Sequence, residues 1–203
     1  MSDQFKVLQI NARKSKETMH SLLNDPGLSD FSCIIVSEPH CFRVKGRNTV
    51  VTSPAQHPRW TAFIPNRFSS SHWPIRSMIW TRTGLKASPV PTPSPDVSAI
   101  SVRIKDRTLL IISAYVPYRG VQTTTRDILI QHIQAIEEVI ETARVKLGEQ
   151  PEIILAGDFN RHDISWGGDE VILSQRQGEA ELLLQFAYNH SLTNLLLRNT
   201  IIY

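Results

Sequence analysis

Two short segments of this 203-residue chain, Leu109–Ala114 and Ile153–Ala156, are apolar almost throughout instead of alternating between apolar and polar residues. Strands with one solvated face alternate, whereas strands covered on both faces are apolar along their length. The two segments therefore predict strands in the inner layers of a multilayer fold. The chain is long enough for such a core, because a domain of this size buries roughly 70% of its unfolded surface.

Further strands and helices are predicted around these two segments. Stretches rich in β-branched and aliphatic residues, separated by turn residues, predict strands at 5–11, 33–36, 49–52, 59–64, 78–81, 97–104, 109–116 and 152–156. Apolar residues at helical spacing predict helices over 15–24, 124–147 and 179–190. The proline-rich segment 87–96 is expected to be a hairpin loop, with a domain linker as the alternative. This order of elements favours mixed sheets with helices outside.

Composition excludes several classes of protein. Hydrophobic residues make up 41% of the chain and charged residues 20%, which is typical of a folded domain. The two cysteines are too few for a disulfide framework or a four-cysteine zinc site. No apolar stretch approaches the roughly 20 residues of a membrane span, and residues 1–6 do not begin a signal sequence. We therefore expect an intracellular protein, nuclear or cytoplasmic, that is neither secreted nor membrane-bound.

A carboxylate and an amide follow the second apolar segment. The strand at 152–156 leads through Gly157 to Asp158 and Asn160. Residues two apart on an extended backbone face the same way, so both side chains are expected to point into one site at a strand end. The carboxylate can orient or deprotonate a water, and the amide can donate to a phosphate oxygen without repelling it. A plain turn is the alternative, because Gly, Asp and Asn are all turn formers.

Three other predicted strands end in polar residues. Glu38 can bind a hard divalent cation through oxygen, with a solvated glutamate as the alternative. Gln9 and Asn11 share one face of the first strand and mark either a site or a satisfied polar network. Tyr115 is either a site residue or a core aromatic whose hydroxyl lies at the edge. The coincidence of four such strand ends predicts a site for metal or phosphate chemistry.

These strand ends carry a family resemblance that spans the whole chain. In order along the sequence, four motifs resemble those of the endonuclease/exonuclease/phosphatase superfamily: Gln9-Ile10-Asn11, Ser37-Glu38-Pro39, Ala114-Tyr115-Val116-Pro117 and Gly157-Asp158-Phe159-Asn160. The segment Gly157–Gly167, with His162 and Trp166 after the acid–amide pair, is most similar to the endonuclease domain of LINE-type non-LTR retrotransposons.

The resemblance implies a fold and an activity. The fold is an α/β four-layer sandwich of two mixed β-sheets flanked by helices, formed by residues 1–203 as one domain. The activity is that of a Mg²⁺-dependent phosphodiesterase, with Mn²⁺ as an alternative ion, that nicks DNA in retrotransposition. A monomeric domain, DNA as partner and a reverse transcriptase domain in the full-length element are further implications. The net charge of +3 permits a polyanionic partner.

The resemblance also implies roles for single residues. Glu38 would be the main metal ligand, with Asn11 beside it. Tyr115 would contact the scissile phosphate, and Asp158 would orient or activate the attacking water. Asn160 would hold the phosphate and the attacking group. The expected substrate contacts are Gln9, His162 and Trp166.

The sequence departs from the family pattern at its end. Family members finish with an aspartate on a late strand and a Ser-Asp-His motif, and these 203 residues contain neither. Leu195–Leu197 and Ile201–Tyr203 look like core strand, so we expect a domain that is incomplete at its C-terminus. Losing one member of a catalytic unit can cost several orders of magnitude in rate. A catalytically inactive retroelement remnant that at most binds nucleic acid is therefore an alternative. Another alternative is an enzyme with the same fold whose substrate is a phosphorylated lipid, sugar or nucleotide.

Overall fold

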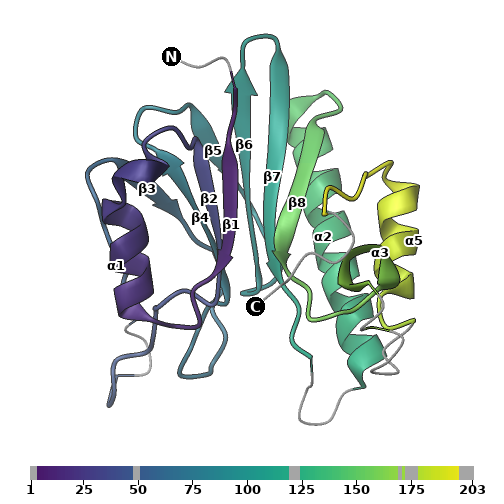
Figure 1. Cartoon of the computed structure of the whole chain (residues 1–203), viewed down its shortest axis with the longest axis horizontal. Helices are drawn as coiled ribbons and strands as arrows, with labels where there is room; N and C mark the ends of the chain where they lie inside the picture. The colour runs from purple at the N-terminus through teal and green to yellow at the C-terminus, as the bar shows by residue number, and fades with distance from the viewer. Residues whose placement is uncertain (1–3, 48–50, 119–123, 169–170, 172–177, 197–203) are drawn as a thin grey trace. The chain divides into compact units, whose positions relative to one another are not determined.

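The computed structural model describes residues 4–47, 51–118, 124–168, 171 and 178–196 (Figure 1). The chain forms two compact units. The first comprises Met1–Tyr115 and Ala135–Asp158, and the second comprises Val116–Gln134 and Phe159–Tyr203. Within the described ranges, no helix is both long and apolar enough to cross a membrane.

The first unit contains two four-stranded sheets. One sheet has the order β1 (Val7–Asn11), β2 (Cys33–Ser37), β4 (Ser77–Arg82) and β3 (Trp60–Phe63). The other has the order β5 (Ala87–Val90), β6 (Val97–Ile104), β7 (Arg107–Tyr115) and β8 (Glu152–Asp158). The neighbours β1–β2 and β7–β8 are parallel and the other pairs are antiparallel, so both sheets are mixed.

The two sheets pack face to face through their apolar side chains. On β2, Cys33 and Ile35 join a buried cluster with Ile100 and Ile111 of the other sheet. The alternate side chains of β2, with Ile34 among them, face the helix α1 (Lys16–Asn24). This alternation gives β2 two buried faces, as expected for a strand in an inner layer.

Helices cover the outer faces of the first unit. The helix α1 (Lys16–Asn24) lies beside the first sheet (Figure 1). It is capped by Ser15, whose Oγ accepts a hydrogen bond from the backbone N–H of Thr18 at 3.0 Å, and its side chains Met19 and Leu23 pack on the sheet. From Ala135 onward, the long helix α2 (Thr125–Leu147) belongs to this unit and buries a stripe of apolar residues at helical spacing: Ile136, Val139, Ile140 and Ala143. The predicted sandwich of two mixed sheets with flanking helices is confirmed.

The second unit is built from helices and short connections. It contains the first part of α2, the short helix α3 (Ile164–Gly167) and α5 (Glu181–Asn189). Its small core is formed by apolar residues of these helices and of the segments that follow β7 and β8: Val116, Ile128, Leu129, Ile133, Phe159 and Leu182.

The structure corrects three expectations. Residues 87–90 form β5 rather than a loop, and Pro89 is tolerated because β5 lies at the edge of its sheet, where a missing N–H breaks few ladder bonds. The strand β7 is covered on both faces, but β8 is only half-buried because it too is an edge strand. Leu195 and Leu196 are 89% and 48% exposed and form no strand, so the prediction of core strand there is wrong.

Other predicted elements are shorter than expected or lie outside the described residues. Val51 forms a single bridge with Arg43 in place of a strand at 49–52, and residues 49–50 are outside the described ranges. Leu197 and Ile201–Tyr203 also lie outside them.

Candidate active site

Four sequence-predicted residues stand at the ends of strands in the first unit. Asn11 ends β1, and Glu38 follows β2 directly; these two strands are parallel neighbours. Tyr115 ends β7 and is the register partner of Asp158, which ends the parallel strand β8. The carboxyl ends of parallel strands meet at one edge of a sheet, so each sheet presents one pair of these residues at its edge.

A hydrogen bond between Asn11 and Asp158 joins the two pairs. Asn11 Nδ2 donates to Asp158 Oδ2 at 2.7 Å, although the residues are 147 positions apart and belong to different sheets. The other atom of the amide, Asn11 Oδ1, accepts a hydrogen bond from the backbone N–H of Arg13 at 2.8 Å. The amide nitrogen and the amide oxygen of Asn11 are therefore both hydrogen-bonded, and this holds the Asp158 carboxylate in one orientation.

Glu38 adopts a strained conformation and is tightly held. Its φ is +50°, in the left-handed region that side chains other than glycine rarely adopt. The backbone N–H of Glu38 donates to the Arg76 carbonyl at 2.8 Å, and its carbonyl accepts from the Lys14 N–H at 2.7 Å. Its carboxylate accepts from Lys14 Nζ at 2.7 Å, and its side chain is 15% exposed. Strain that the surroundings hold in place is a common feature of functional sites.

Tyr115 lies in the electric field of both carboxylates. Burial raises the pKa of its phenol to about 12, and the negative charges of Glu38 and Asp158 act in the same direction, while the guanidinium of Arg76 opposes them. The Arg76 guanidinium lies 5.0 Å from the centre of the Tyr115 ring. The phenol therefore remains a hydrogen-bond donor at neutral pH.

An ion pair between Arg76 and Asp96, which the sequence pattern does not predict, holds Tyr115 in place. Arg76 Nε and Nη2 donate to the two carboxylate oxygens of Asp96 at 2.6 and 2.5 Å. The carbonyl of Asp96 accepts from the Tyr115 backbone N–H at 2.9 Å. Two-pronged contacts of this kind fix geometry as well as charge. Lys14 was likewise missed, because no spacing pattern connects a lysine to a glutamate 24 positions away.

Gly157 allows the close approach of β8 to β7 just before Asp158. Its φ is +151°, and a Cβ built on it would lie 1.8 Å from the carbonyl oxygen of Ala114. No other amino acid fits this position without moving the backbone that carries Tyr115. The glycine of the fourth motif is therefore a steric requirement of the strand end.

In the second unit, Asn160 is also held in a left-handed conformation. Its φ is +47°, and its Nδ2 donates to the carbonyl of Val116 at 3.1 Å. Arg161 is only 5% exposed, and its guanidinium donates to the carbonyls of Asn160 at 2.8 Å and Thr125 at 2.7 Å. This buried arginine organises the segment around Asn160. Sequence reasoning missed it, since an arginine between Asn160 and His162 looks like an ordinary surface residue.

The three expected substrate contacts lie in different surroundings. Gln9 is exposed on β1 of the first unit, and His162 is half-buried in the second. Trp166 is 8% exposed, and its Nε1 donates to the Arg161 carbonyl at 3.3 Å. The Trp166 ring therefore packs inside its unit.

The converging donor set of the first unit fits a hard divalent cation. Among the residues that the structure describes, no three His, Cys, Asp or Glu side chains form a cluster that could hold a metal. The donors available at these strand ends are the Asp158 carboxylate, the Asn11 amide hydrogen-bonded to it, and the carboxylate of Glu38, which directly follows Ser37, the strand partner of Asn11. Mg²⁺ is commonly held by one or two carboxylates, with waters and substrate phosphates completing its shell, so this sparse oxygen set is compatible with it.

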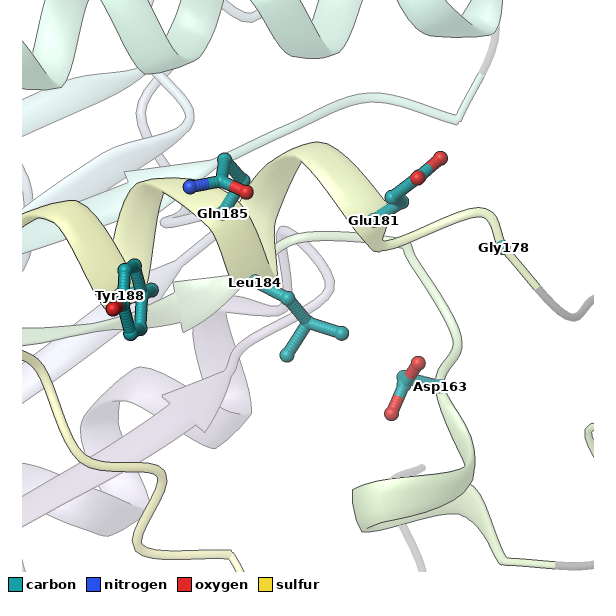
Figure 2. A pocket seen from close by; sticks show the side chains of 6 residues that line it. All are labelled: Asp163, Gly178, Glu181, Leu184, Gln185 and Tyr188. Atoms are coloured by element: carbon teal, nitrogen blue, oxygen red, sulfur yellow. The ribbon is translucent and has the colours of Figure 1, made fainter.

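A pocket on the second unit has a different character. It is lined by Asp163 at the start of α3 and by residues from 178 to 188, and Figure 2 shows Asp163, Glu181 and Leu184 around the same hollow. It contains none of the strand-end residues described above. Its two carboxylates would repel a phosphate, so this pocket does not suit a phosphate ester.

Comparisons with known proteins agree with this fold. The family model described as endonuclease-reverse transcriptase matches residues 109–202, which include Tyr115, Asp158 and Asn160. No curated protein matches the sequence. Among solved structures, the endonuclease domain of TRAS1, a telomere-specific non-LTR retrotransposon, is similar with a TM-score of 0.66 and 14% identity, over 97% of this chain and 75% of that one.

Two further solved structures share the fold. The AP endonuclease LMAP from Leishmania major has a TM-score of 0.55 and 11% identity, over 77% of this chain and 55% of that one. An endonuclease/exonuclease/phosphatase family protein from Leptotrichia buccalis C-1013-b has a TM-score of 0.50 and 14% identity, over 85% and 74%. These structures show that this chain has the fold of the proteins named, and the matching family model is consistent with the resemblance to the endonuclease/exonuclease/phosphatase superfamily.

Proposed function

We propose that this chain is a divalent-metal-dependent phosphodiesterase that nicks DNA. The observation that carries the proposal is the 2.7 Å hydrogen bond from Asn11 to Asp158, which brings the strand ends of two sheets together beside Glu38 and Tyr115. The description of the matching family model and the likeness to the TRAS1 endonuclease domain support a role in retrotransposition, next to a reverse transcriptase domain.

In this proposal, Glu38 and Asn11 hold Mg²⁺ or Mn²⁺. The bound ion would offset negative charge on the phosphate and on the leaving oxygen. Tyr115 donates a hydrogen bond to a phosphate oxygen, which it can do because its pKa of about 12 keeps the phenol protonated. The ion pair of Arg76 and Asp96 holds the Tyr115 ring in position.

Asp158 orients the attacking water and accepts its proton in the same proposal. The hydrogen bond from Asn11 holds the carboxylate in one orientation, which reduces the number of unproductive arrangements. Asn160, two residues further along the chain, holds the phosphate and the attacking group, and its left-handed backbone and bond to Val116 restrict its side chain. Gln9 and His162 remain proposed substrate contacts, whereas Trp166 supports the Asn160 segment from inside.

A second candidate function is nucleic-acid binding without cleavage. One observation favours it: the ammonium of Lys14 is bound to the proposed main metal ligand, Glu38. In that case the site would recognise phosphate without completing the reaction.

Nicking of a supercoiled plasmid in Mg²⁺ separates the two candidates. The parent chain should convert supercoiled plasmid to nicked circles, and Asp158→Ala should lower the rate at least about 100-fold, as expected for a member of a catalytic unit. Asp106→Ala, in the exposed turn between β6 and β7, is the matched control and should cut like the parent. Equal cutting by the parent and Asp158→Ala would contradict the enzyme proposal. Oligonucleotide binding without any nicking would establish the second candidate.

A further inference from the structure

Four aromatic rings gather beside the candidate site. His40 and Phe42 lie in the segment after Glu38, and His72 and Trp73 lie in the segment before β4. The centres of the Phe42 and His72 rings are 5.6 Å apart, and the ring planes are within 29° of parallel. The Trp73 ring centre lies 5.0 Å from that of His72 and 5.8 Å from that of His40. We call these four rings the aromatic platform.

The topology places the aromatic platform at the same sheet edge as Glu38. Because β2 and β4 are antiparallel neighbours, the end of β2 and the start of β4 meet at one edge. Lys14 connects the platform with the carboxylate directly: its Nζ lies 2.7 Å from Glu38 Oε1 and 5.8 Å from the centre of the Trp73 ring. A nucleic acid whose phosphate is held by a divalent ion at Glu38 would therefore extend over the platform within one or two nucleotides.

The two segments that carry the rings are fastened to each other. The backbone N–H of Arg43 donates to the carbonyl of His72 at 2.8 Å, and its guanidinium donates to the carbonyl of Ser69 at 2.5 Å. His40 Nδ1 pairs with the carbonyl of Lys14 at 2.7 Å. The rings are therefore preorganised, and a ligand would not have to order them on binding.

The platform is only partly covered by protein. His72 is exposed, and the other three rings are half-buried, unlike the buried core residues Trp60 and Trp80. Exposed rings combined with neighbouring cations are the arrangement by which proteins bind single-stranded nucleic acid, since bases stack on the rings and phosphates meet the positive charges. Here Lys14 and Arg43 supply those charges.

We propose that the aromatic platform is a stacking subsite for the base of an unpaired nucleotide next to the phosphate that the divalent ion at Glu38 would bind. This inference rests on the proposed function and specifies the kind of nucleic acid that the site binds. A base inside an intact duplex has both faces covered by its neighbours, so it cannot stack on protein rings without first leaving the helix. The subsite therefore selects nucleic acid with an unpaired nucleotide at that position over a fully paired duplex.

Binding measured without cleavage tests the subsite. Fluorescently labelled duplexes with one unpaired nucleotide, the same duplexes with an abasic residue in its place, and fully paired duplexes are titrated with protein in Ca²⁺ in place of Mg²⁺. Base stacking on an aromatic residue is worth about 1–3 kcal/mol, so His72→Ala should bind the unpaired nucleotide about 5- to 150-fold more weakly. The same substitution should change binding to the abasic and fully paired duplexes less than about twofold.

Matched variants separate a lost subsite from a misfolded chain. His72 is exposed, so His72→Ala should keep the parent's circular dichroism spectrum, and Trp73→Phe should keep most of the affinity because it retains a ring. Phe68→Ala removes a 45% exposed aromatic residue outside the platform and should bind like the parent. Equal affinity of His72→Ala and the parent for the unpaired nucleotide would overturn the inference.

Failure of the subsite can be distinguished from failure of the proposed function. If the parent nicks plasmid and Asp158→Ala does not, but the platform substitutions leave binding unchanged, only the subsite inference is wrong. If the parent binds none of the duplexes and instead binds vesicles that contain a phosphorylated lipid, both the DNA function and the subsite are wrong.

Discussion

Gly157→Ala is expected to destabilise this chain more than an alanine at any other glycine with positive φ that the structure describes. The new methyl group would lie 1.8 Å from the Ala114 carbonyl oxygen and less than 3 Å from two other backbone atoms of the same residue. These atoms belong to β7, which is hydrogen-bonded on both sides, so they cannot move aside like the tip of a flexible side chain. The parallel pairing of Tyr115 with Asp158 is next to the clash.

The size of the effect follows from two contributions. Forcing a side chain into a conformation reserved for glycine costs about 1–3 kcal/mol. Overpacking a well-packed site costs about another 1–3 kcal/mol. The 1.8 Å approach is far inside any normal contact, so we expect the upper part of both ranges, about 4–6 kcal/mol in total. For a chain of this length, each 1 kcal/mol lowers Tm by about 2–4 °C, which predicts a fall of roughly 10 °C or more.

Thermal unfolding followed by circular dichroism measures this effect, and Gly148→Ala is the matched control. Gly148 also has a positive φ, +66°, but a Cβ there meets no atom within 4 Å. Its substitution should cost only the backbone strain of about 1–2 kcal/mol. If Gly157→Ala unfolds at the same temperature as Gly148→Ala, the close approach of β8 to β7 does not limit this position and the reasoning is refuted.

Two further predictions concern the charged groups of the site. First, the pKa of Tyr115 is raised to about 12 from the ordinary value of 10, so its contribution to stability is fully present below pH 10 and is lost as the pH rises through about 12. An ultraviolet titration of the parent and Tyr115→Phe should show one phenol ionising near pH 12, and a difference centred on pH 10 would contradict the field described above. Second, Lys14→Met should tighten Mn²⁺ binding up to about fivefold in calorimetric titrations, because the competing ammonium is removed from Glu38. Lys16→Met, an exposed lysine on α1, should leave the affinity unchanged, and weaker binding by Lys14→Met would show that the lysine assists the ion instead.

The strand ends were predictable because their signal is local. An apolar run followed directly by an acid, an amide or a tyrosine can be read from a few neighbouring residues, and parallel strands then place such residues at one edge. Similarly, the buried stripe of α2 follows from its period alone. The strand-end signal is the reason that Asn11, Glu38, Tyr115 and Asp158 could be predicted from the sequence.

Features that depend on tertiary contacts were not predictable in this way. Arg76 and Asp96 form a two-pronged ion pair across 20 residues, and Arg161 is buried by carbonyl groups from other segments. Nothing in their immediate sequence distinguishes them from surface charges. The strand β5 was missed for a related reason, since Pro89 argues against a strand unless its edge position is known. Leu195 illustrates the opposite error: its apolar neighbourhood predicts a buried strand, but the side chain is exposed.

Because Asn11 and Asp158 are hydrogen-bonded across two sheets, the spacing of these two proposed site residues depends on the packing between the sheets. Since each partner is rigidly attached to a different sheet, their separation is set by the thickness of the hydrocarbon layer that lies between those sheets. Side chains such as Ile35 and Ile111, which never meet a substrate, thus act as the spacer that determines whether donor and acceptor remain within reach.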